Sequence, residues 1–230
     1  MPVWSITDTK QHIFRIYGKE QIELVKHSLQ SICLRGEYAH YYYHEANKLL
    51  DNYLQKEFKT KEPIEVVFEN SDSKENILIQ IEANVLACLS NIHAVADTFS
   101  YAIYYSLGLN LKDNSLNEEK INITSVLNLI RLNKEFDKLD KLLTSLKVDG
   151  NFKHLTAIVN NTKHRELKRL ELFFDLTAEL DKSYSIKIPA YRGYPKVEMK
   201  DFLTTEYNRI FKLHIDIGNA INEILSKRQI

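Results

Sequence analysis

Glycine and proline are scarce in this chain, and this scarcity constrains the fold more than any other feature. Only 6 glycines and 4 prolines occur in 230 residues, and apolar residues recur every three to four positions in the long stretches between them. Because that spacing places apolar side chains on one side of an α-helix, the chain is predicted to be mainly helical. The expected helices cover residues 18–59, 73–109, 136–146, 152–159 and 202–225, with Ser73 as the N-cap of the second.

Two segments interrupt this helical pattern. Residues 64–68, after Pro63, are a short β-branched run that predicts a strand or an extended link. From about 170 to 198, apolar and polar residues alternate with period two, which is typical of strands. The predicted fold class is therefore mainly α, a bundle of long helices with a small inserted β-hairpin at about 170–198, in a single domain over residues 1–230.

Composition narrows the classes of function. Lysine and arginine together number 31, as do aspartate and glutamate, so no overall charge points to nucleic acid and any such site must be local. The two cysteines, Cys33 and Cys88, lie within apolar helical patterns, which excludes a disulfide scaffold and a multi-cysteine zinc site. The first ten residues lack the apolar core of a signal peptide, and polar residues interrupt the most apolar window, 84–111, so we expect a cytoplasmic protein without a membrane span.

The apolar stripes also predict a core. The stripe of the most apolar helix is expected to pack against the stripe at 136–146 and against the one at 210–221 in the last helix. The stripe of this most apolar helix consists of Val85, Leu86, Leu89, Ile92, Phe99 and Ile103.

A first candidate site lies on the first long helix, where Glu37, His40 and His44 share one face. Metals in helical bundles use this spacing, although a di-iron carboxylate centre would need a second Glu-x-x-His motif and two further glutamates. The other interpretation is a solvated polar face beside a run of three tyrosines. A metal-dependent bundle enzyme that combines these residues with His93 and Asp97 is a further alternative.

A second candidate is the pair of His93 and Asp97, one turn apart in the most apolar helix. Ionisable groups are costly there unless they are paired, so both are predicted to be buried and hydrogen-bonded. The carboxylate would set the imidazole tautomer for a general base, or the pair would be a structural hydrogen bond that fixes helix packing. In both interpretations the two residues support the fold or another site.

The third candidate is a basic cluster at an expected helix-to-strand junction. Lys163, His164, Arg165, Lys168 and Arg169 place five basic residues in seven positions. His164 could move a proton while neighbouring cations stabilise negative charge on a phosphate, and Lys168 and Arg169 would bind nucleic acid. The alternative is a solvated basic corner that interacts with a helix C-terminus.

Two short motifs give the chain a resemblance to a known family. They are Ile-His-Ala-Val-Ala-Asp at 92–97 and Val-Asn-Asn-Thr-Lys-His-Arg at 159–165, followed by a hairpin and a closing helix. This layout, over about 84–225, resembles bacterial helical proteins related to the HEPN (higher eukaryotes and prokaryotes nucleotide-binding) superfamily. The resemblance implies a helical bundle that usually dimerises, and in many members a metal-independent endoribonuclease of toxin–antitoxin and phage-defence systems.

The same resemblance implies site residues. The family signature is an arginine, usually followed by a polar residue, with a histidine a few residues further on. If His164 is that histidine, Asn160 serves as the polar residue, whereas Ala-Ile-Val at 157–159 occupies the place of the arginine. Lys163 and Arg165 supply positive charge outside the signature position.

The expected function is therefore directed at RNA or a nucleotide, in a homodimer that has neither a metal nor another cofactor. His164 would assist attack of a ribose 2′-hydroxyl on the adjacent phosphate, and Lys163 and Arg165 would stabilise the phosphorane from one concave surface. An antitoxin or another protein is an expected partner, and a membrane is not. The alternative is a catalytically inert helical module for protein–protein interaction, which the missing arginine favours and the basic cluster does not.

Overall fold

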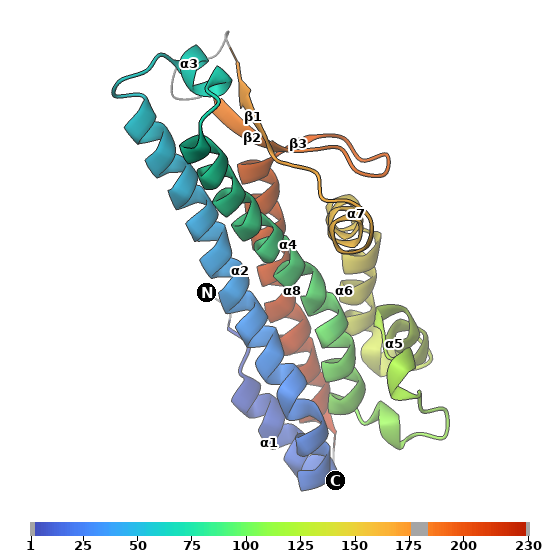
Figure 1. Cartoon of the computed structure of the whole chain (residues 1–230). Helices are drawn as coiled ribbons and strands as arrows, with labels where there is room; N and C mark the ends of the chain where they lie inside the picture. The colour runs from blue at the N-terminus through green and yellow to red at the C-terminus, as the bar shows by residue number, and fades with distance from the viewer. Residues whose placement is uncertain (1–2, 176–183, 229–230) are drawn as a thin grey trace. The chain divides into compact units, whose positions relative to one another are not determined.

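A computed structural model describes residues 3–175 and 184–228 of the chain (Figure 1). The protein is mainly helical, with long helices and a small three-stranded antiparallel sheet, so the predicted fold class is confirmed. The helices are α1 (Ile6–Tyr17), α2 (Lys19–Glu57), α3 (Pro63–Phe68), α4 (Asp72–Ser106), α5 (Ile123–Ile130), α6 (Asp137–Val148), α7 (Gly150–His164) and α8 (Met199–Lys227). The strands are β1 (Glu171–Phe174), β2 (Tyr184–Ile188) and β3 (Val197–Glu198), and short 3₁₀ helices cover Leu109–Leu111, Glu118–Lys120 and Lys134–Phe136.

The start of α4 differs slightly from its prediction. The hydroxyl of Ser71, just before the helix, accepts a hydrogen bond from the backbone N–H of Lys74 at 3.3 Å. Ser71 therefore caps the helix, and the predicted cap at Ser73 is wrong by two positions. The ammonium of Lys74 also donates to the carbonyl of Glu69 at 3.0 Å, which ties the link before α4 to its first turn.

The predicted strand or extended link at 64–68 is wrong, because this segment belongs to α3. Pro63 lies in the first turn of α3, where a missing N–H costs nothing and the fixed φ suits a helix. The carboxylate of Glu65 accepts a hydrogen bond from the backbone N–H of Glu62 at 2.8 Å. These capping interactions outweigh the weak strand preference of β-branched residues.

The chain divides into two compact units. Unit 1 contains Met1–Gly36, Ile92–Lys153 and Asn208–Ile230, whereas unit 2 contains Glu37–Asn91 and His154–Tyr207. Each unit is thus assembled from stretches that are far apart in the sequence. No single point in the sequence separates the two units. The division into units does not test whether the chain is one domain, so the single domain over residues 1–230 stays a prediction.

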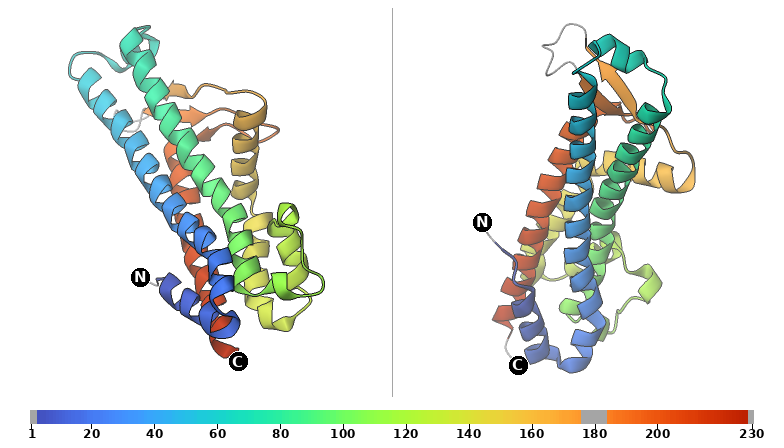
Figure 2. Two further views of the ribbon diagram at one scale, coloured as in Figure 1. Left: turned by 60° about the horizontal axis from the view of Figure 1, so that its bottom comes forward. Right: turned by 60° about the vertical axis from the view of Figure 1, so that its left-hand side comes forward.

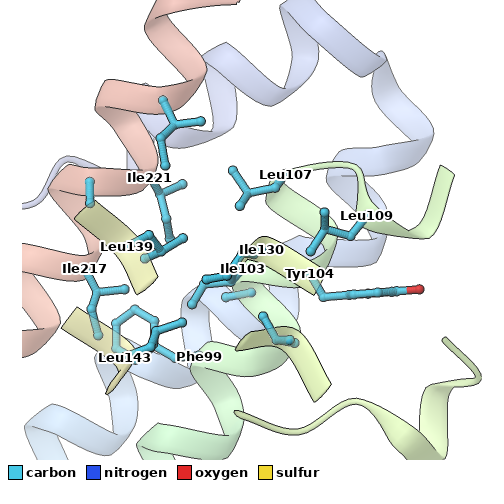
Figure 3. Close-up of a cluster of buried hydrophobic side chains, with 14 of the residues drawn as sticks. Phe99, Ile103, Tyr104, Leu107, Leu109, Ile130, Leu139, Leu143, Ile217 and Ile221 are labelled. Atoms are coloured by element: carbon cyan, nitrogen blue, oxygen red, sulfur yellow. The ribbon is translucent and has the colours of Figure 1, made fainter. Parts of the chain in front are cut away.

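A cluster of buried aliphatic and aromatic side chains forms the core of unit 1 (Figure 3). It includes Phe99, Ile103, Tyr104 and Leu107 of α4, Leu139 and Leu143 of α6, and Ile217 and Ile221 of α8. This cluster confirms the predicted packing of α4 against the stripes at 136–146 and 210–221. Val85 and Leu89 are also buried but belong to unit 2, and Leu86, which was expected to be buried, is half-buried.

The N-terminal segment of unit 1 is held against α8, and α1 lies beside the last turns of that helix (Figures 1 and 2). Trp4 stacks on Phe99 with ring centroids 5.8 Å apart, and its indole N–H donates to the hydroxyl of Thr9 at 2.9 Å. The Thr9 hydroxyl donates to the side-chain oxygen of Asn222 in α8 at 2.6 Å. A Cβ atom at Gly218 would overlap the indole ring, so the absence of a side chain there allows the contact.

Two glycine-to-alanine substitutions should therefore change stability in opposite directions. Gly218→Ala should destabilise the protein by about 1 to 3 kcal/mol, because the new methyl group displaces Trp4 from its packed position. Gly36→Ala, inside α2 where the new Cβ meets no atom within 4 Å beyond the adjacent residues and the backbone of its own helix, should stabilise it by about 0.5 to 1 kcal/mol. Thermal unfolding measures both, and a fall in melting temperature at both positions would contradict the account of Gly218.

The small sheet belongs to unit 2, where its strands run in the order β1, β2, β3 with antiparallel pairing. Leu172 of β1 lies opposite Ile186 of β2, and α3 packs against β1 (Figure 1). The predicted hairpin is thus confirmed, and β3 extends it. The predicted link between its strands, 178–183, lies outside the described residues.

The helix α4 contributes residues to both units, and it is strongly apolar. Within the described part of the chain it is the one helix long and apolar enough to cross a membrane by length and composition, with a window of mean hydropathy 1.3 that is 33% buried. Its buried residues include Val85 and Leu89 in unit 2 and Phe99 and Ile103 in unit 1. Each unit therefore uses the apolar character of α4 for its own core.

Candidate nucleic-acid interface

The basic cluster lies where α7 ends and the link to β1 begins, within unit 2. The carbonyl of the buried Asn161 accepts hydrogen bonds from the backbone N–H groups of Arg165 at 2.9 Å and Glu166 at 3.1 Å, which closes the helix. Lys163, His164 and Arg165 are all exposed at this end. The end of α7 therefore leaves these three side chains exposed to solvent, and we call them the basic junction.

The basic junction has no carboxylate partner among residues 3–175 and 184–228. None of Lys163, His164 and Arg165 forms an ion pair or side-chain hydrogen bond with the residues that the structure describes. Unpaired cations at a helix C-terminus interact favourably with the helix dipole and stay available to an external anion. This availability distinguishes the basic junction from the two basic residues that follow it.

Lys168 and Arg169, predicted to bind nucleic acid, are held by other groups of unit 2. The ammonium of Lys168 donates to the carbonyl of Ala190 at 3.0 Å and lies over the ring of Tyr191, 5.0 Å from its centroid. Arg169 forms ion pairs of 2.7 Å with both Glu75 and Glu82, and the side chain of Glu82 is 8% exposed. The two residues fasten the link between α7 and β1, so a ligand would have to compete for Arg169.

The segment preceding the basic junction supplies no further cation. Ala157, Ile158 and Val159, where the resemblance would require an arginine, are all buried in the packing of α7. Asn160, the expected polar residue, is half-buried. The face of α7 at these positions therefore contributes to the core of unit 2 and does not widen the basic surface.

Sequence reasoning missed His154, which lies on the buried side of α7. Its ring stacks on Tyr194 with centroids 4.8 Å apart and planes at 13°, and it also contacts Phe202. Burial lowers the pKa of His154, and its Nε2 atom has no hydrogen-bond partner among the described residues. His154 lies four residues before the buried Ile158, and residues at this spacing share one face of a helix. This spacing is the signal from which the burial of His154 could have been predicted. His154 holds the loop after β2 against α7.

The loop after β2 carries an exposed arginine in an unusual backbone conformation. Arg192 and Gly193 have φ angles of 46° and 82°, and they form a tight turn closed by hydrogen bonds between Tyr191 and Tyr194. Non-glycine residues rarely adopt positive φ, at a cost on the order of 1 kcal/mol. Lys168 binds the carbonyl of Ala190, two residues earlier, so this turn lies in the same part of unit 2 as the link from the basic junction.

The prediction that His93 and Asp97 are both buried is wrong. Asp97 is exposed and His93 is half-buried, with its ring stacked on Phe152 at a centroid distance of 5.9 Å. The buried Phe99 and Ile103 define the core side of α4, and helix geometry places Asp97 on the opposite side. The two residues do not form the buried pair on which the prediction of a supporting role rested. That supporting role stays a prediction.

Glu37, His40 and His44 lie exposed on α2, in unit 2. The two imidazole rings lie with centroids 4.2 Å apart, and the Nδ1 atom of His40 is hydrogen-bonded to the hydroxyl of Tyr207 at 3.0 Å. Within the described ranges, no three histidine, cysteine, aspartate or glutamate side chains are close enough to surround a metal ion. The three-residue motif therefore does not form a complete metal centre.

A surface hollow of about 540 Å³ lies elsewhere in unit 2, between the end of α2 and the start of α4. Lys61 bridges Glu57 and Glu69 on its wall, at 2.7 and 2.8 Å. Tyr53 also lines it, and burial together with Glu69 and Glu57 raises the pKa of Tyr53 to about 12. Four lysines and two glutamates line this hollow, and both glutamates are engaged by Lys61, whereas the described residues place no carboxylate on the basic junction.

Neither cysteine forms a disulfide within the described residues. Cys33 is exposed, whereas Cys88 is buried and its Sγ donates to the carbonyl of Ala39 at 3.4 Å. Burial raises the pKa of the Cys88 thiol to about 12, so it stays protonated and unreactive at neutral pH.

Comparison with known proteins adds no assignment to this site. No family model, no curated protein and no solved structure matches the chain.

Proposed function

We propose that the protein binds RNA through the basic junction and acts as a metal-independent endoribonuclease of HEPN-like type. The observation that carries this proposal is the exposure of Lys163, His164 and Arg165 with no carboxylate partner in the described part of the chain, whereas two carboxylates hold the neighbouring Arg169. In a chain with no net charge, free cations concentrated around a histidine favour a local phosphate site.

The proposed reaction uses only groups of this chain. His164 accepts the proton of a ribose 2′-hydroxyl as its oxygen attacks the adjacent phosphorus. The bond from phosphorus to the 5′-oxygen of the next nucleotide breaks, which leaves a 2′,3′-cyclic phosphate, and the protonated His164 returns its proton to the departing 5′-oxygen. Lys163 and Arg165 stabilise the negative charge of the phosphorane. A homodimer would bring two such junctions together, and an antitoxin-like protein would cover them, in a defence or toxin–antitoxin role.

A second candidate function is an inert helical interaction module. The burial of Ala157, Ile158 and Val159 favours it, because that segment offers no second cation in the position that the family signature requires. In this case the basic junction would bind an acidic protein surface or RNA without cleavage.

The double variant Lys163→Ala, Arg165→Ala tests binding. The slope of log affinity for single-stranded RNA against log salt should fall by about 1.4, since each phosphate contact contributes about 0.7. The matched control is Lys153→Ala, Lys200→Ala, which removes two exposed lysines outside the basic junction and should bind like the wild type. Fluorescence anisotropy at several salt concentrations measures both, and equal losses in the two variants would contradict a specific site.

His164→Ala separates the two candidate functions. It should abolish RNA cleavage in the presence of a chelator while leaving RNA binding and the circular dichroism spectrum unchanged. RNA binding without any cleavage by the wild type would favour the interaction module. If the wild type neither binds nor cleaves RNA at low salt, the RNA-directed function is wrong.

A further inference from the structure

We propose that His40 and His44 of α2 bind one divalent transition-metal ion of the zinc and copper class, as a two-histidine site on the surface of unit 2. The two residues are one helical turn apart in an unbroken α-helix, and both are exposed. Neutral imidazole nitrogen is a preferred ligand of zinc, copper and nickel. This site is independent of the basic junction and of the metal-free reaction proposed for it.

The distance between the rings suits a shared ion. Two nitrogen ligands that each lie 2.0 to 2.1 Å from one ion are roughly 3 Å apart. The ring centroids of His40 and His44 are 4.2 Å apart with planes at 70°, so rotation of the His44 side chain can bring one of its nitrogens to a common point with the Nε2 atom of His40. Because a helix sets the separation of the two Cβ atoms, the chain pays little conformational entropy to bring the ligands together.

Three side chains of unit 2 orient His40. Its Nδ1 atom is hydrogen-bonded to the hydroxyl of Tyr207 at 3.0 Å, which leaves Nε2 for an ion. Tyr207 stacks on Tyr43 with planes at 7° and centroids 5.6 Å apart. The hydroxyl of Tyr43 is in turn hydrogen-bonded to that of Thr204 at 2.8 Å. Metal-binding histidines characteristically have such a partner on the second ring nitrogen, because it fixes the tautomer and the ring orientation.

The site takes two ligands from the protein and the remainder from water. Within the described ranges no third histidine, cysteine, aspartate or glutamate completes a cluster around the two rings. Open positions of this kind leave the ion accessible, and the order of affinity should follow the general preference of nitrogen sites, copper above zinc.

Calorimetric titration of the full chain with zinc chloride tests the proposal. The wild type should bind one ion per chain, and His40→Ala and His44→Ala should each weaken binding by about tenfold or more, because each leaves a single exposed imidazole. His27→Ala is the matched control, since it removes another exposed histidine of α2 that has no histidine one turn away, and it should bind zinc like the wild type. Tyr207→Phe should weaken binding by about tenfold while keeping one ion per chain.

A copper titration gives a second readout that does not depend on affinity. The electron paramagnetic resonance spectrum of the copper-loaded wild type should show coupling to two imidazole nitrogens, and that of either single variant to one. Absence of saturable zinc binding, or retention of wild-type binding and of two-nitrogen coupling in His44→Ala, would overturn the proposal.

Discussion

Replacing Phe99 with alanine is expected to lower the free energy of unfolding by about 3 to 5 kcal/mol. Phe99 is 1% exposed and lies in the core cluster of unit 1, between the ring of Trp4 and that of His214, whose centroid is 5.2 Å away. Its removal leaves a cavity that several neighbouring elements must fill, and the contacts of the Trp4 ring are lost with it. Urea denaturation followed by circular dichroism measures the change.

Phe14→Ala provides the matched control for this experiment. Phe14 lies on α1 in the same unit, and 57% of its surface is exposed, so the same chemical change should cost about 0.5 kcal/mol or less. Similar losses at Phe14 and Phe99 would show that the cluster in Figure 3 is not the main source of stability in unit 1.

Acid should destabilise unit 1 through His214. Burial, with a smaller effect of the positive charge on Arg209, lowers the pKa of His214 to about 3. An imidazole in the unfolded chain titrates near about 6.5, so between these two values the unfolded state binds more protons than the folded state. The stability associated with the neutral imidazole is complete above about pH 6.5 and is lost as the pH falls toward 3, by roughly 3 kcal/mol at about pH 4.5.

A difference between variants isolates this contribution. In His214→Leu the free energy of unfolding should fall less steeply between about pH 7 and pH 4.5 than in the wild type. The ion pairs of Glu135 and Glu223 also weaken in acid, but they remain in both proteins and cancel in the comparison. Trp4, the only tryptophan, reports the unfolding of unit 1 by fluorescence, and His27→Gln controls for the loss of an exposed histidine. Parallel pH profiles of the wild type and His214→Leu would contradict the prediction.

The long helices and the core of unit 1 could be predicted because periodic patterns encode them locally. Apolar residues at three- and four-residue spacing define α2, α4, α6 and α8, and the same stripes meet in the cluster around Phe99. The period-two alternation after residue 170 likewise predicted β1 and β2. In each case every residue of the element contributes to the signal, so single exceptions do not matter.

The candidate sites were predicted less well because a side chain's partner is not encoded locally. The pattern that placed Arg169 in a basic cluster contains no sign of Glu75 and Glu82, which lie almost a hundred residues earlier and hold its guanidinium. Asp97 is a different case, since its exposure follows from the position of Phe99 on α4 once the core side of the helix is known. Apolar surroundings in sequence are therefore a poor guide to the burial of an individual charged residue.

The contact between Trp4 and Gly218 also sets an order for folding during synthesis. A ribosome adds about 5 to 20 residues per second, so roughly 10 to 40 seconds pass between the appearance of Trp4 and that of its partner. The last stretch of unit 2 ends at Tyr207, before the final stretch of unit 1 begins at Asn208. Unit 2 can therefore close on the growing chain before Trp4 and Thr9 meet their partners in α8. Unit 1 is therefore completed last, because Trp4 and Thr9 lie more than two hundred residues before the α8 residues that they contact.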